Sequence, residues 1–260
     1  MANEFDRTPE TTLHEMERFL FASVEECRGW STLNHARELL RREIAEISQW
    51  RLSRGESSWV AVEDLEPKKA RQVATFHLAG VGSRAAGSVV ALVACGYVTE
   101  AKASLRRMRE ALLRARLVFD DESGHHARAW LSGRPLRGLT YLESRYGMRG
   151  AMKSFSPPAH ADMKGLLPLL NEEESRVQAN LAPQRNDEEV VEAMFRLVAS
   201  EILGFLGLLA ETHPQYTSSR FSAEIEELQE ELGVPLFKFE DVPHVEAGES
   251  EFVRFQSEDS

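Results

Sequence analysis

The chain has 260 residues, of which 42% are apolar and 28% charged, so it is too apolar for a disordered protein. It is also long enough to bury a core without disulfides or bound metals. With 31 basic against 42 acidic residues, its formal net charge of −11 argues against unselective binding to nucleic acid or to anionic lipid. The two cysteines, Cys27 and Cys95, lie in apolar stretches, which predicts reduced, core-packed thiols and excludes a disulfide framework.

The N-terminal sequence lacks the pattern of a secretory signal, and the longest weakly interrupted apolar run, residues 87–98, is shorter than the roughly 20 residues that span a bilayer. We therefore expect a cytoplasmic protein with no membrane partner.

Apolar residues recur at three- and four-residue steps along most of the chain, which predicts an all-α fold. Residues 9–52 fit two helices that form a hairpin around a break at residues 29–31, and a helix resumes at Pro67 after a polar loop. The longest pattern, residues 86–119, predicts the central helix of a bundle because two of its faces are apolar. A second long helix is expected over residues 186–211.

The other predicted helices are shorter, and prolines separate most of them. They cover residues 124–132, 137–147, 159–170 and 222–232. From residue 239 to the end, seven acidic residues stand against Arg254 alone, which predicts an exposed tail. We therefore expect a helical hairpin with its loop over 1–66, a helical bundle over 67–232 and an acidic extended tail over 233–260.

Charge is unevenly distributed along the chain. Residues 102–153 hold twelve basic and five acidic residues, which makes this segment +7 in a chain of −11. Either acidic helices elsewhere pair with these arginines, or the segment presents a basic surface to RNA or to another phosphate ligand. On the second interpretation Arg107, Arg109 and Arg114 are the candidate anion-binding residues.

Two motifs are similar to cofactor or metal sites. Residues 80–85 match the dinucleotide fingerprint G-x-G-x-x-A, but the predicted helix leaves no room for the second strand that such a site needs. We interpret the segment as a glycine-rich turn between helices. The run Asp120-Asp121-Glu122 is similar to the magnesium motif of helical terpene synthases but lacks carboxylates one turn later, so Asp120 or Asp121 is predicted to cap a helix.

Metal sites of other kinds lack their full ligand sets in this sequence. Glu122-x-x-His125 matches half of a di-iron helix pair, and no second copy occurs. Cysteine and histidine show no zinc-binding spacing either. We therefore expect neither a metal nor a cofactor.

Arg106 and Glu110 lie one turn apart within the predicted helix 86–119. On a helical wheel they share a stripe with apolar residues, Cys95 before them and Leu113 after them. A buried arginine and a buried glutamate must be paired, because either one alone would cost several kcal/mol. The pattern therefore predicts an ion pair that points into the bundle.

An apolar helix leads here to Ser104-Leu105, Arg106 and Glu110-Ala111, and a loop downstream holds Ser156-Pro-Pro-Ala-His160. These features resemble an uncharacterised bacterial all-helical family with the pattern Ser-Leu-x-Arg-x-x-x-Glu-Ala, then a helix that begins at aspartate and a loop with Ser-x-x-x-His. Asp120 or Asp121 matches the aspartate. The resemblance covers residues 86–170, and the two prolines inside the loop depart from it.

Families of this kind are compared with the HEPN helical superfamily, many of whose members are metal-independent ribonucleases. The resemblance therefore implies a catalytic set in which Arg106, held by Glu110, binds a phosphate while His160 exchanges a proton. The alternative is structural: Arg106 and Glu110 fix the helix register, and His160 bonds to a loop carbonyl.

Two functions follow from the sequence. The first is a helical protein that acts through association with a protein partner or with itself, in a bacterial stress or defence setting that only the resemblance implies. The second is a HEPN-like ribonuclease that uses Arg106, Glu110 and His160 beside the basic segment.

Overall fold

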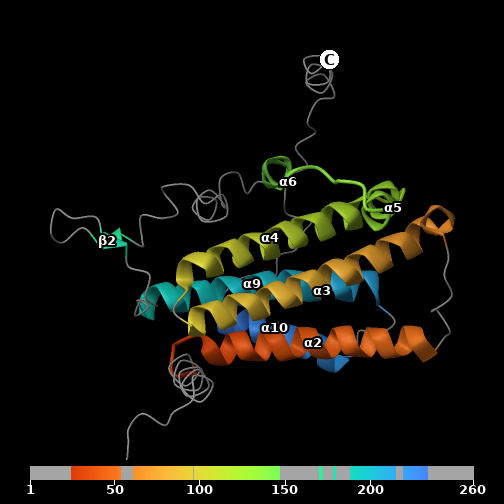
Figure 1. Cartoon of the computed structure of the whole chain (residues 1–260). Helices are drawn as coiled ribbons and strands as arrows, with labels where there is room; N and C mark the ends of the chain where they lie inside the picture. The colour runs from red at the N-terminus through yellow and green to blue at the C-terminus, as the bar shows by residue number, and fades with distance from the viewer. Residues whose placement is uncertain are drawn as a thin grey trace, which may run out of the picture.

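The computed structural model describes residues 25–53, 61–95, 97–146, 170–171, 178–179, 188–214 and 219–233, and this part of the chain forms an all-α bundle (Figure 1). The predicted fold class is therefore confirmed. The long helices are α2 (Trp30–Ser53), α3 (Pro67–Ala94), α4 (Val98–Asp120), α9 (Glu188–Thr212) and α10 (Ser219–Leu232). The short elements are the 3-10 helix η1 (Val62–Asp64), the helices α5 (His125–Leu131) and α6 (Leu139–Arg145), and the paired two-residue strands β1 (Leu170–Asn171) and β2 (Gln178–Ala179).

The prediction of one continuous helix over 86–119 was wrong. The structure has two helices there, because α3 ends at Ala94 and α4 begins at Val98. The amide of Tyr97 donates to the carbonyl of Leu92 at 2.7 Å, a bond that spans five residues and closes the end of a helix. α3 and α4 pack against each other as an antiparallel pair at the front of the bundle (Figure 1).

Gly82 lies inside α3, so the prediction of a glycine-rich turn over residues 80–85 was also wrong. A Cβ atom at Gly82 would lie 2.3 Å from the ring of Phe205 on α9. The glycine therefore allows α3 and α9 to approach closely, which outweighs the cost of glycine within a helix. Phe205 is fully buried at this contact.

α9 supplies the largest share of apolar side chains to the core. It buries thirteen of its residues, among them Phe195, Ile202 and Phe205. α3 and α9 are the two described helices that are long and apolar enough to cross a membrane by length and composition alone. Both contribute buried side chains to one core shared with α2, α4 and α10, and a core helix passes the same test.

α10 packs on α2 and α9 through apolar residues, and ion pairs connect it to α2. The two terminal guanidinium nitrogens of Arg42 on α2 donate to the two carboxylate oxygens of Glu224 on α10. Next to Arg42 in the sequence, Glu43 is buried with only 3% of its surface exposed. Burial, together with the neighbouring Glu46 and Glu224, raises the pKa of Glu43 to about 7, although Arg42 opposes the shift.

We expect the stability of the bundle to fall between pH 5 and pH 8 because of Glu43. Its folded-state pKa of about 7 exceeds the ordinary value of 4.5, so the folded chain binds a proton that the unfolded chain has released. Glu43→Gln removes this pH dependence. The free energy of unfolding of the variant, relative to that of the wild type, should therefore rise by about 2 kcal/mol from pH 5 to pH 8. Urea denaturation of both proteins at pH 5 and pH 8 measures this difference. Glu38→Gln, at an exposed position of α2, controls for the loss of a charge, and an equal change in both variants would contradict the assignment.

The loop between α4 and α5 is fixed by Asp121. One carboxylate oxygen accepts from the amide and hydroxyl of Ser123, and the other accepts from the amide of His126 at 2.7 Å and lies 2.9 Å from its Nδ1. Burial opposes ionisation of Asp121, but these hydrogen bonds outweigh it and lower its pKa to about 2. The predicted N-cap role is not found, because Gly124 is the N-cap of α5 and Asp121 is the C-cap of α4. The side chain of Asp121 instead accepts from the amide of His126 in the first turn of α5.

Candidate functional site

The sequence-predicted catalytic residues Arg106 and Glu110 both lie on α4, where each is half-buried. The structure gives Glu110 a different partner from the predicted one, because its carboxylate bonds to the guanidinium of Arg114 one turn later at 2.5 Å. The helical wheel had also counted Cys95 on the stripe of Arg106 and Glu110, although Cys95 ends α3 and lies outside α4. His160 lies outside the described residues, so its place in a catalytic set stays a prediction.

Of the three predicted anion-binding arginines, Arg107 is exposed, Arg114 is half-buried against Glu110, and Arg109 is buried. Arg109 forms an ion pair with Glu201 of α9, which is itself only 3% exposed. The predicted buried pair Arg106–Glu110 is thus not found, and a different buried pair, Arg109–Glu201, joins α4 to α9. Its sequence signal was Glu201 itself, a lone acid in an apolar run.

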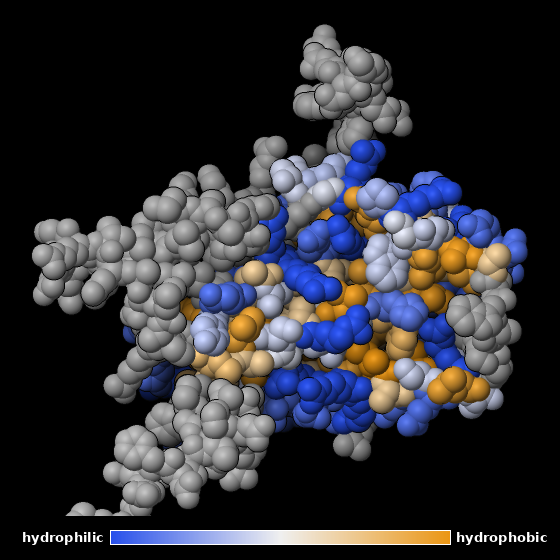
Figure 2. Space-filling model, in the orientation of Figure 1, coloured by the Kyte–Doolittle hydropathy of each residue, from blue (hydrophilic) through white to orange (hydrophobic). Residues whose placement is uncertain are grey.

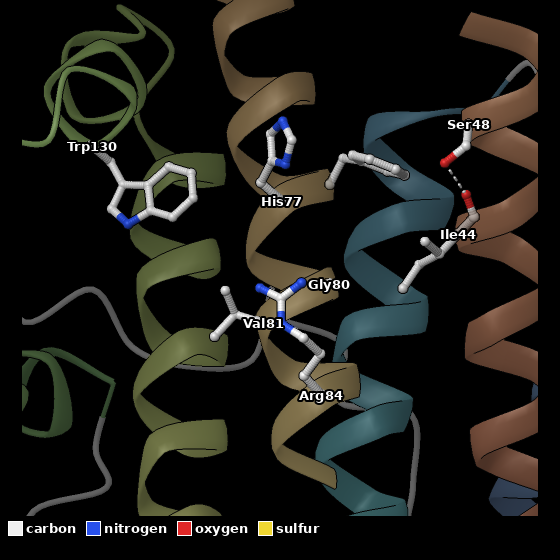
Figure 3. Close-up of a pocket in the computed structure, with 8 residues that line it drawn as sticks. Ile44, Ser48, His77, Gly80, Val81, Arg84 and Trp130 are labelled. Atoms are coloured by element: carbon white, nitrogen blue, oxygen red, sulfur yellow. Dashed lines mark hydrogen bonds between the residues drawn. The ribbon is translucent and has the colours of Figure 1, made fainter. Parts of the chain in front are cut away.

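A pocket of about 410 Å³ lies on the outer side of α3, between α2 and α5. Volumes of this size are typical of small-ligand sites. Its lining residues are Ile44, Ser48, Phe76, His77, Gly80, Val81, Arg84 and Trp130. In Figure 3, Trp130 lies on one side, Ile44 and Ser48 of α2 lie on the other, and the labelled residues of α3 lie between them.

Trp130 is held in place because α5 is tied to the loop before α3. The guanidinium of Arg128 donates to the carbonyl of Leu65 at 3.2 Å and to that of Ser123 at 2.8 Å. Gly124 adopts a φ of +69° directly before α5, and a Cβ there would lie 2.8 Å from Cα of Pro67. This close approach requires glycine and fixes α5, with its indole, beside the start of α3.

The pocket is electropositive although the whole chain is acidic. None of the described residues that line it is Asp or Glu, and Arg84 directs its guanidinium across the α3 side of the pocket (Figure 3). Burial lowers the pKa of His77, and the guanidinium groups of Arg51 and Arg84 lower it further. A pKa below the ordinary 6.5 favours the neutral imidazole of His77 at pH 7.

Aromatic and apolar groups make up the rest of the lining. The ring of Phe76 lies under the guanidinium of Arg51 at 5.4 Å and meets the ring of His77 edge-on, with centroids 5.6 Å apart. Ser48 contributes little polarity, because its hydroxyl donates to the carbonyl of Ile44 at 2.8 Å. Figure 2 shows hydrophobic surface along α3, with hydrophilic side chains over α2 below it.

Sequence reasoning missed this pocket, although one signal was present. Arg84 is the only Asp, Glu, Lys or Arg between Arg71 and Glu100. A lone arginine in an apolar helix is a candidate for a buried ion pair or for contact with an anion. The structure shows that it is exposed and has no acidic partner among the described residues.

No family model, curated protein or solved structure matches the chain. The resemblance to the all-helical bacterial family and to the HEPN superfamily therefore stays a prediction from sequence.

Proposed function

We propose that this protein is a cytoplasmic binding protein that acts through association and that its α2–α3–α5 pocket holds an anionic group of what it binds. The observation that carries the proposal is a carboxylate-free, cationic pocket in a chain of net charge −11. Arg84 is the one charged residue among the described residues that line this pocket.

Arg84 is the residue that would bind the anion. It lines the pocket, is exposed to an incoming ligand and has no acidic partner among the described residues, so an anion can supply its missing acceptor. Arg51 adds a second positive charge close to His77. By contrast, Arg109 and Arg114 of the basic segment already bind Glu201 and Glu110.

The test uses 8-anilino-1-naphthalenesulfonate, an apolar anion whose fluorescence rises when it is bound. We expect Arg84→Gln to weaken its Kd about tenfold, because a charge-assisted hydrogen bond contributes about 1.5 kcal/mol. The matched control is Arg107→Gln, which removes an exposed arginine from α4 and should leave the Kd unchanged.

Added salt should weaken the binding to the wild type more than the binding to Arg84→Gln. If only Arg107→Gln bound the probe more weakly, the anion site would lie in the basic segment of α4 and not in the pocket. Equal Kd values for all three proteins would contradict the proposal.

A further inference from the structure

We infer that the ligand of the α2–α3–α5 pocket is a planar aromatic anion, with its ring in the apolar part of the pocket and its acidic group at Arg84. The inference rests on the proposed function and specifies its ligand class. It depends on the shape of the pocket and on the kinds of side chain that line its two sides.

The two sides of the pocket differ in chemistry from its centre. Trp130 on α5 and Ile44 on α2 form apolar sides, and Phe76 of α3 adds a second aromatic ring to the lining. Flat rings pack well against such surfaces, because aromatic pairs gain from offset or edge-on contact as well as from burial. An aliphatic anion of the same charge would leave this apolar surface exposed to water.

Gly80 leaves open space on the α3 side of the pocket. It lines the pocket, and no described atom outside its own helical turn lies within 4 Å of the position that its Cβ would take. A side chain at this position would therefore project into the space that a ring would occupy. Gly87, two turns further along α3, also has no described atom within 4 Å of its Cβ position, but it does not line the pocket.

The polar side chains of the pocket, Arg84 and His77, can bind one acidic substituent at the edge of an aromatic ring. Arg84 is one turn from Gly80, and His77 is nearly one turn away in the opposite direction, so both border the same part of the pocket. The guanidinium pairs with a carboxylate, sulfonate or phosphate oxygen. The neutral imidazole of His77 can donate or accept one hydrogen bond without adding charge.

Three probes separate the ring from the charge: 6-fluoro-2-naphthoate has both, trifluoroacetate has only the anion, and 6-fluoro-2-naphthamide has only the ring. Their binding to the full chain is followed by fluorine NMR line broadening. We expect the naphthoate to bind at least about tenfold more tightly than either of the others. Gly80→Leu should abolish this preference, and the matched variant Gly87→Leu should retain it.

Each outcome decides a separate point. If trifluoroacetate binds as tightly as the naphthoate and depends on Arg84, the ring inference is wrong and the proposed anion site stands. If none of the probes binds, both fail. If Gly80→Leu binds like the wild type, the ring lies elsewhere. Circular dichroism checks that Gly80→Leu is folded. If it is not, Trp130→Leu replaces it, and we expect this variant to lose the preference for the naphthoate. An unchanged preference in Trp130→Leu would contradict the inference.

Discussion

Replacing either member of the buried pair Arg109–Glu201 should destabilise the protein by about 3 to 5 kcal/mol. The pair joins α4 to α9, and both side chains are almost fully shielded from water. Glu201→Met leaves a guanidinium in the core without its carboxylate, and Arg109→Met leaves a buried carboxylate without its guanidinium. In both variants the remaining charge loses its ion-pair partner at a position that is shielded from water.

The double variant Arg109→Met/Glu201→Met should regain most of the loss, because two apolar side chains of similar length can pack where the pair was. Urea denaturation of the wild type, both single variants and the double variant gives the coupling free energy directly. Arg107→Met, two residues away on the exposed side of α4, is the control and should change stability by less than about 0.5 kcal/mol. Additive losses in the double variant would show that the two charges do not depend on each other.

Alanine at Gly82 should destabilise the bundle by about 3 kcal/mol, whereas alanine at Gly87 should stabilise it. A methyl group at Gly82 would lie 2.3 Å from a ring atom of Phe205, so α3 and α9 would have to separate. At Gly87 no described atom lies within 4 Å, and alanine should add about 0.5 to 1 kcal/mol because glycine is unfavourable in a helix. Glycine to alanine thus changes the stability of the bundle in opposite directions at two positions of the same helix.

Thermal and urea unfolding of the two variants measure this difference. Adding Phe205→Leu to Gly82→Ala should recover part of the loss, because a smaller side chain makes room for the methyl group. If Gly82→Ala were as stable as the wild type, α3 and α9 would not meet closely at this position. That result would contradict the packing at the centre of the bundle.

The helices were predictable because they depend on local spacing. The apolar repeat placed the starts of α3 at Pro67 and of α9 near residue 188 to within about two residues, and the predicted piece at 124–132 corresponds to α5. The break between α3 and α4 was missed because the apolar pattern continues through it. Gly96, in the sequence just after Cys95, was the available signal, since glycine commonly follows the end of a helix.

The candidate site was less predictable because its residues come from three helices. Ser48, Gly80 and Trp130 are far apart in the sequence and have no spacing that relates them. Gly80 and Gly82 were interpreted together as a turn, yet one lines a pocket and the other packs against Phe205. Only their neighbours in space distinguish the two glycines.

The sequence by itself determined that this chain is all-α, that it needs no disulfide, and where several of its helices begin. These properties follow from hydrogen bonds and side-chain repeats within a few residues of each other. The tertiary structure decided which charge pairs with which, as Arg109 with Glu201 and Glu110 with Arg114, and where a cationic aromatic pocket opens. Those outcomes depend on how α2, α3, α4, α5 and α9 pack, and packing brings together residues that the sequence separates.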